Sequence, residues 1–470
     1  MSSYSTTAGP GPSSSLNVNL TATNKDKVSY FFNETTAKFH YGEGHPMKPA
    51  RLGLAHNLII GYGLHKKMHC YTQRRATESE MSEFHSEDYI EFLRRVTPDN
   101  ANAFSKFLSR FNVGVDDCPV FEGLYDFCRL SAGGSIEGGR KLCAGSDIAI
   151  NWAGGLHHAK KFEASGFCYV NDIVLGILQL LRIYPRVVYI DIDVHHGDGV
   201  QEAFYQSDRV MTVSFHRYDG SFFPGTGSLD EIGIRAGKNY SVNVPLQEHI
   251  DDTSYSYIFE KVMQNVMDVY QPSAVVLQCG ADSLAGDRLG SFNLSIKGHG
   301  SCVAFMKKFK VPLLVLGGGG YTIRNVARAW CYETSLCTNT NLSDSLPQNQ
   351  YIMHYGPDYK LHSNSVDKNA ENANTRQYLD QIYIAIRENL RNLNWAPSVA
   401  MNEIPPDLQG FNAETGNWEV DEAEDKNPEL RVDQGKYGLD ASQRLRRDKD
   451  MNEYDEREMY EGDHDQDHDG

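Results

Sequence analysis

The segment Val187–Gly199 constrains the fold and the chemistry of this chain more strongly than its overall composition does. It begins with the apolar run VVYI, whose β-branched residues are typical of a buried parallel strand. It continues as DIDVHHGDG, and because side chains alternate across a strand, we expect Asp191, Asp193 and His195 to share one face. Two carboxylates and an imidazole crowded at a buried strand end are costly to desolvate, and a divalent cation would remove that cost. A hydrogen-bonded polar network without metal is the alternative interpretation.

Apolar runs alternate with amphipathic stretches through the middle of the chain. Further strands are expected at residues 210–215, 274–277 and 311–316, and helices at 173–181, 199–205 and 257–270. Asp172 is placed to cap the first of these helices. This alternation predicts an α/β fold, a single large domain with a central parallel β-sheet and helices on both faces. In such sheets the functional site lies beyond the carboxyl ends of the strands.

Three other segments place polar side chains where strands or loops should end. LQCGAD delivers the carboxylate of Asp282, and LGGGGY delivers Tyr321 after glycines that let the backbone turn sharply. The glycines could instead cradle a phosphate, but neither Gly-Lys-Ser/Thr nor a G-x-G-x-x-G motif accompanies them. The loop WAGGLHHAK supplies His157 and His158, side chains suited to proton transfer near neutral pH.

The charge balance and the two ends of the chain narrow the class of protein. With 45 Lys and Arg against 62 Asp and Glu, the net charge of −17 argues against direct, sequence-specific nucleic-acid binding and suits a Lys-rich partner. Nine cysteines without a Cys-x-x-Cys pair favour a reducing compartment. No signal peptide and no apolar run of membrane-spanning length is evident, so we expect an intracellular protein that does not enter the membrane. Residues 1–27 and the acidic stretch 396–470 are expected to be disordered, with one folded domain between them at 28–395.

Over roughly residues 28 to 395 the chain resembles the class I zinc histone deacetylases. The landmarks, in chain order, are YGEGHPMKP (41–49), DCP (117–119), GGLHHAK (154–160), SGFCY (165–169), DIDVHHGDG (191–199), FFPGTG (222–227), GAD (280–282) and GGGGY (317–321). Each motif alone is weak evidence for the family, but eight of them in the same order over one domain are specific for it.

The resemblance implies an arginase- and deacetylase-like fold and a zinc-dependent hydrolase acting on N6-acetyl-lysine. The zinc ligands would be Asp193, His195 and Asp282, and three protein ligands leave a position open, as a catalytic zinc requires. The resemblance also implies a catalytic set, in which His158 is the general base and then the acid, His157 gives electrostatic support, Asp191 and Asp198 orient the two histidines, and Tyr321 donates to the oxyanion. The tube for the lysine side chain would be formed by Gly166, Phe167, Phe223 and Leu289, with Asp117 at the rim and Arg51 in an inner channel that handles acetate. Core packing is the alternative interpretation for Phe167 and Phe223.

Further ligands and partners follow only from the resemblance. One potassium site would involve Asp191, Asp193, His195, Ser214 and Phe215, and a second Phe204, Ser207, Val210 and Tyr240. An inositol phosphate would bind a cluster comprising His40, Gly44, Lys48, Arg288 and Arg324, for which a solvated surface is the alternative. The resemblance also implies that the protein binds acetylated histone tails and subunits of a corepressor complex. It implies residence in the nucleus, with the cytoplasm as a further location. The rival functions are a deacylase for another acylated amine and a catalytically silent scaffold that binds acetyl-lysine.

Overall fold

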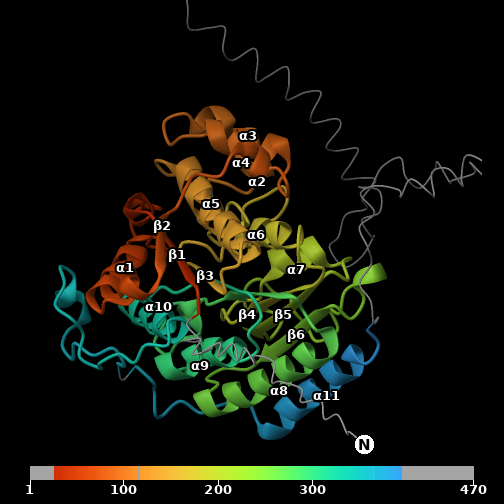
Figure 1. The fold of residues 1–470 in the computed structure, drawn as a ribbon. Coiled ribbons are helices and arrows are strands. Elements are labelled where there is room, and N and C mark those ends of the chain that lie inside the picture. The colour runs from red at the N-terminus through yellow and green to blue at the C-terminus, as the bar shows by residue number, and fades with distance from the viewer. Residues whose placement is uncertain (1–25, 115–116, 364, 394–470) are drawn as a thin grey trace, which may run out of the picture. The chain divides into compact units, whose positions relative to one another are not determined.

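The computed structural model describes residues 26–114, 117–363 and 365–393 (Figure 1). The predicted disordered segment 1–27, apart from its last two residues, and the predicted tail 396–470 lie outside these ranges. All of the described residues belong to one compact unit.

A single sheet of eight parallel strands forms the centre of the described unit and confirms the predicted α/β fold. The strands are β1 (Val28–Phe32), β2 (His69–Thr72), β3 (Ile148–Asn151), β4 (Val187–Asp191), β5 (Val210–Arg217), β6 (Ser241–Leu246), β7 (Ala274–Gln278) and β8 (Leu313–Leu316). Their order across the sheet is β2-β1-β3-β8-β7-β4-β5-β6, so the last strand in sequence lies in the middle.

Eleven α-helices surround the sheet in the part of the chain that the structure describes. They are α1 (Ala50–Gly61), α2 (Glu78–Met81), α3 (Glu87–Arg95), α4 (Ser105–Arg110), α5 (Leu124–Cys143), α6 (Asp172–Leu180), α7 (Asp198–Phe204), α8 (Asp252–Tyr270), α9 (Ile296–Lys307), α10 (Ile323–Cys337) and α11 (Arg376–Leu390). Short 3₁₀ turns occur at η1 (Glu34–Lys38), η2 (Leu64–Lys67), η3 (Ala101–Phe104), η4 (Arg235–Gly237), η5 (Ala281–Ser283) and η6 (Ile352–Tyr355). Among the helices of these described residues, none has both the length and the apolar character needed to cross a bilayer.

The central strands are buried on both faces, which explains their uninterrupted apolar sequences. In β4, Val188 and Ile190 pack into the cluster formed with α1, α8, α9 and α10, whereas Val187 and Tyr189 pack into the cluster formed with α5, α6 and α7. Figure 1 shows these two helical layers on opposite sides of the sheet. The closed core leaves the carboxyl ends of the strands as the place for a site.

The structure contains strands that were not predicted from the sequence, and it corrects one predicted helix cap. The four predicted strands are present as β4, β5, β7 and β8, but β1, β2, β3 and β6 were not predicted. The prediction that Asp172 caps α6 is wrong, because the cap is Asn171, whose side chain accepts the N–H of Val174 at 3.1 Å. Asp172 is buried and instead accepts the backbone N–H groups of Gly155 and Leu156, each at 2.9 Å.

Candidate metal centre and active site

Four neighbouring strands, β3, β8, β7 and β4, end at one edge of the sheet, and each continues into a loop with candidate functional residues. In the same strand order, these loops supply His157 with His158, Tyr321, Asp282, and Asp193 with His195. Residues that are distant in sequence thus meet because their strands are parallel neighbours.

The predicted alternation of side chains along the strand applies only as far as Asp191, where β4 ends. Asp193 and His195 lie in the irregular segment that follows, yet their side chains meet. The backbone N–H of His195 donates to Asp193 Oδ1 at 3.0 Å, and His195 Nδ1 lies 3.0 Å from the same oxygen. A local turn, and not the pleat of a strand, brings the two side chains together.

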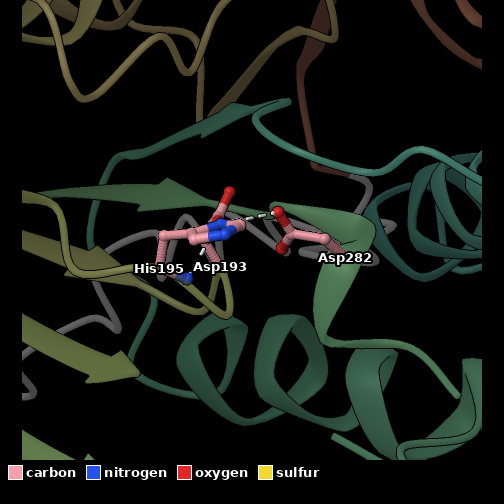
Figure 2. A group of neighbouring side chains, drawn as sticks. All are labelled: Asp193, His195 and Asp282. Atoms are coloured by element: carbon pink, nitrogen blue, oxygen red, sulfur yellow. Dashed lines mark hydrogen bonds and ion pairs between the residues drawn. The ribbon is translucent and has the colours of Figure 1, made fainter. Parts of the chain in front are cut away.

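Asp193, His195 and Asp282 form a buried group whose ligand atoms all lie within 4.8 Å of one another. His195 Nδ1 is 3.1 Å from Asp282 Oδ2, so one imidazole nitrogen faces both carboxylates (Figure 2). The three side chains could hold a metal ion, as the sequence predicted. One nitrogen and two carboxylate oxygens are ligands that a divalent transition metal such as zinc accepts.

The charges of this group depend strongly on one another. Burial and the nearby Asp193 carboxylate raise the pKa of Asp282 to about 7. Burial alone would raise the pKa of Asp193 as well, but the charges of His157 and His195 hold it well below its usual range. Positive charge on the neighbouring imidazoles therefore favours the ionised form of these buried acids.

Neighbouring donors fix the orientation of the two carboxylates. Asp193 Oδ2 accepts the backbone N–H of Gly319 at 2.8 Å and the Gln278 side-chain amide at 2.9 Å. Asp282 Oδ1 accepts the backbone N–H of Val194 at 2.9 Å. Each acid is held by elements from another strand end, which gives the group a defined geometry before any ligand binds.

His157 is paired with the last residue of β4. Its Nδ1 lies 2.7 Å from Asp191 Oδ2, and the Tyr189 hydroxyl donates to the same carboxylate. Burial alone would lower the pKa of His157, but the Asp191 and Asp193 carboxylates raise it to about 9. Protonated imidazole next to the carboxylates gives positive charge at this side of the site.

His158 has a second, different partner. Its Nδ1 lies 2.7 Å from Asp198 Oδ1, and the other oxygen of Asp198 accepts from Lys160 Nζ at 2.5 Å. Burial and the adjacent His157 lower the pKa of His158 to about 4, so this imidazole is neutral near pH 7. Nδ1 faces the carboxylate and therefore carries the proton, which leaves Nε2 as an acceptor.

The glycine run after β8 forms a turn held by a buried arginine. Gly318 and Gly320 have φ of 144° and 121°, conformations that favour glycine. The Arg51 guanidinium donates to the Gly320 carbonyl at 2.6 Å and to the Gly318 carbonyl at 2.5 Å, and it lies over the Trp330 ring. Arg51, predicted to lie in an inner channel, thus also shapes the turn that leads into Tyr321.

Aromatic side chains border the two histidines and Tyr321. The Phe167 ring meets the Tyr321 ring edge-on with centroids 5.6 Å apart, and the Phe223 ring meets the His158 ring at 4.9 Å. Between them lies Gly166, where a Cβ would fall 2.5 Å from His158 Cδ2. Phe223 is 41% exposed, whereas Phe167 is partly buried against the core cluster that contains Tyr321, so core packing describes part of the environment of Phe167 but not that of Phe223.

The remaining predicted residues comprise two rim positions, two potassium sets and one inositol phosphate set. Leu289 is 36% exposed, and Asp117 is exposed next to residues 115 and 116, which are outside the described ranges. For the first potassium site, Asp191 of β4 and Ser214 of β5 are register partners on adjacent strands, Phe215 follows Ser214 in β5, and Asp193 and His195 lie in the segment after β4. The second predicted set lies at the end of α7 and the starts of β5 and β6, and comprises Phe204, Ser207, Val210 and Tyr240. The five positions predicted for an inositol phosphate are all exposed, and comprise His40, Gly44, Lys48, Arg288 and Arg324.

Sequence reasoning missed the residues that support the site. Gln278 and Lys160 stand inside motifs that were recognised, and their polar side chains next to proposed functional residues were a usable signal. Behind the Asp282 segment, a buried His299 donates to the Gly280 carbonyl at 2.9 Å and is paired with Glu333. No local pattern marks that pair, because its members lie on α9 and α10 within ordinary helical sequence.

The sequence is similar to known proteins over most of its length. Residues 45–337 match the family model described as histone deacetylase domain. Histone deacetylase B of Dictyostelium discoideum is 60% identical over 395 residues, which are 83% of this chain and 93% of that protein. Histone deacetylase RPD3 of Saccharomyces cerevisiae is 56% identical over 411 residues, 87% of this chain and 93% of the relative. Histone deacetylase clr6 of Schizosaccharomyces pombe is 57% identical over 403 residues, 86% of this chain and 98% of the relative.

Proposed function

Because this chain belongs to the histone deacetylase family and is a deacetylase, we propose that it hydrolyses N6-acetyl-lysine in histone tails with a zinc ion held by Asp193, His195 and Asp282. The observation that carries the proposal is the buried group of these three side chains, bordered by paired histidines and by Tyr321. A zinc ion there would supply Lewis acidity toward the acetyl carbonyl and would activate water. Three protein ligands leave room for a substrate oxygen.

His158 is the proposed proton carrier. Its neutral ring, with Nδ1 directed at Asp198, offers Nε2 to the attacking water. As the water oxygen bonds to the acetyl carbon, the proton passes to His158, and it then moves to the lysine nitrogen as the C–N bond breaks. The products are acetic acid and the lysine amine, and transfer of the second proton of the water leaves acetate and a lysine ammonium.

Two other side chains act on charge in this proposal. His157, paired with Asp191, provides fixed positive charge beside the reacting carbonyl. The Tyr321 hydroxyl donates to the oxygen that becomes negative, a role whose loss typically lowers kcat about 10²–10³-fold. Asp191 and Asp198 hold the two imidazoles in one orientation.

The substrate tube is proposed to follow the aromatic wall. Phe167 and Phe223 would flank the apolar lysine stem, Gly166 leaves the space between them, and Leu289 and Asp117 would contact the peptide at the rim. Arg51 would bind released acetate through N–H groups that Gly318 and Gly320 do not occupy.

Partners and further ligands are proposed on the family likeness. The acidic charge of the chain suits Lys-rich histone tails, and we propose work in the nucleus as the catalytic subunit of a corepressor complex. Potassium at the ends of β4 and β5 is a further proposal. Another is an inositol phosphate at the exposed positions His40, Gly44, Lys48, Arg288 and Arg324.

The test is acetate release from an acetylated histone-tail peptide by the purified full chain, with zinc content measured on the same samples. We expect activity in the wild type and in the surface control Asp126→Asn. Activity and bound zinc should both fall in Asp193→Asn, and a chelated sample should recover both when zinc is added back. A zinc-loaded wild type without activity would direct attention to another acylated amine. Full activity in Asp193→Asn would refute the metal assignment.

A further inference from the structure

We infer that Asp287 is a positioning residue, whose carboxylate ties the backbone of Tyr321 to the backbone of Leu289. It would thereby set where the tyrosine hydroxyl stands relative to the lysine tube. The inference rests on the proposed function, since it assumes that Tyr321 and Leu289 serve the reaction in the roles given above.

The contacts of Asp287 span two segments that are distant in sequence. Its Oδ2 accepts the backbone N–H of Tyr321 at 2.7 Å and that of Thr322 at 3.0 Å. Its Oδ1 accepts the backbone N–H of Leu289 at 3.0 Å. The same two segments are joined by another hydrogen bond, in which the Thr322 hydroxyl donates to the Gly286 carbonyl at 2.9 Å. One carboxylate thus joins the proposed oxyanion donor to the rim of the tube.

A carboxylate suits this position because Asp287 accepts the N–H of Thr322, the N-cap residue of α10 (Ile323–Cys337), and that of Tyr321, which directly precedes it. The first N–H groups of a helix have no intrahelical acceptor and carry partial positive charge. Thr322, at the N-cap position of α10, makes no capping hydrogen bond with its own side chain, and the first turn of the helix contains no acid. Asp287 supplies from another segment the negative acceptor that the local sequence lacks.

Tyr321 therefore stands between two clamps. On its N-terminal side, Arg51 holds the carbonyls of Gly318 and Gly320. On its C-terminal side, Asp287 holds the N–H groups of Tyr321 and Thr322. Because glycine backbone is free to rotate, the tyrosine would shift if either clamp were lost, and a misplacement of about 1 Å can lower a rate about 10²-fold.

The test is a double-mutant cycle on acetylated histone-tail peptide with the zinc-loaded full chain. Asp287→Ala is expected to lower kcat about 10–10²-fold while bound zinc stays at the wild-type level. In a Tyr321→Phe background the same change should lower kcat less than about threefold, because the hydroxyl that Asp287 positions is already absent. Asp287→Asn, which keeps the shape and one acceptor oxygen, should give an intermediate kcat.

Asp251→Ala is the matched control. Asp251 caps α8 by accepting the Ser254 N–H at 2.8 Å, so this change also removes an aspartate from a helix start. We expect a similar loss of thermal stability in Asp251→Ala, with kcat unchanged. A kcat loss in this control equal to that of Asp287→Ala would overturn the inference, since general destabilisation would explain both.

Two further outcomes have separate meanings. Equal kcat losses from Asp287→Ala in the wild-type and Tyr321→Phe backgrounds would overturn the positioning role while leaving the proposed function intact. Wild-type kcat in Tyr321→Phe itself would remove the oxyanion role of the tyrosine, and the inference for Asp287 would fall with it.

Discussion

Replacing Gly155 by alanine tests how tightly the histidine loop is packed against the glycine turn. Gly155 has φ of 92°, and a Cβ there would lie 2.3 Å from the carbonyl oxygen of Gly317 and 2.6 Å from the nitrogen of Gly318. The backbone conformation alone costs an alanine about 1–2 kcal/mol. Both near atoms belong to backbone and cannot rotate away, so overpacking adds about 1–3 kcal/mol. We therefore expect Gly155→Ala to lower the free energy of unfolding by about 2–5 kcal/mol.

Gly145→Ala separates the two contributions. Gly145 also has φ of 92°, but a Cβ there would have nothing within 4 Å. Denaturant unfolding should show only the conformational loss of about 1–2 kcal/mol for this variant. Deacetylation should fall only in Gly155→Ala. The added Cβ would press on the backbone of Gly317 and Gly318, and His157 and Tyr321 follow these two segments closely in sequence. Equal losses of stability in the two variants would refute the packing argument.

Two other predictions concern buried cations and imidazoles. Arg51→Lys should lower the free energy of unfolding by about 1–3 kcal/mol, because an ammonium cannot donate to Gly318 and Gly320 in the same geometry; unchanged denaturant stability would contradict this. Burial lowers the pKa of His85 to about 4. In the unfolded chain this imidazole has an ordinary pKa of about 6.5, so it binds a proton at a pH where the folded chain does not. The free energy of unfolding therefore falls as the pH drops from about 6.5 to about 4. His85→Gln keeps an acceptor for the Asn171 N–H and should lose less over that window. A stability difference that does not vary with pH would count against the assignment.

The strands that could be predicted lie in the centre of the sheet or next to it. β4, β7 and β8 contain continuous apolar runs, and β5 contains β-branched and aromatic residues. The unpredicted β2 and β6 are the two edges, where the sequence pattern is weaker: β2 is largely exposed, and β6 contains Pro245, a residue suited to an edge. β1 and β3 lie between β2 and the centre, and their sequences, VSYFF and IAIN, interrupt the apolar residues with Ser29 and end them at Asn151.

The candidate site was predictable where its residues follow strand ends in conspicuous motifs. Asp193, His195 and Asp282 were placed together correctly, although the turn after β4, and not its pleat, accomplishes it. Asn171 and Asp172 are both capping types, so local sequence could not tell which one caps α6. Asp287 could not be predicted at all, because its partners are backbone N–H groups that any sequence possesses.

The position of β8 has a consequence for how the chain is made. Among the strands of the described residues, β8 is the last to leave the ribosome, yet it lies between β3 and β7 and joins two groups of strands that are synthesised before it. Until residue 316 has emerged, both of those strands present unpaired edges in the middle of the future sheet, which are templates for pairing with other chains. The same late strand leads into the glycine turn and Tyr321, so the nascent protein completes its hydrogen-bonded sheet and its reactive centre in one step.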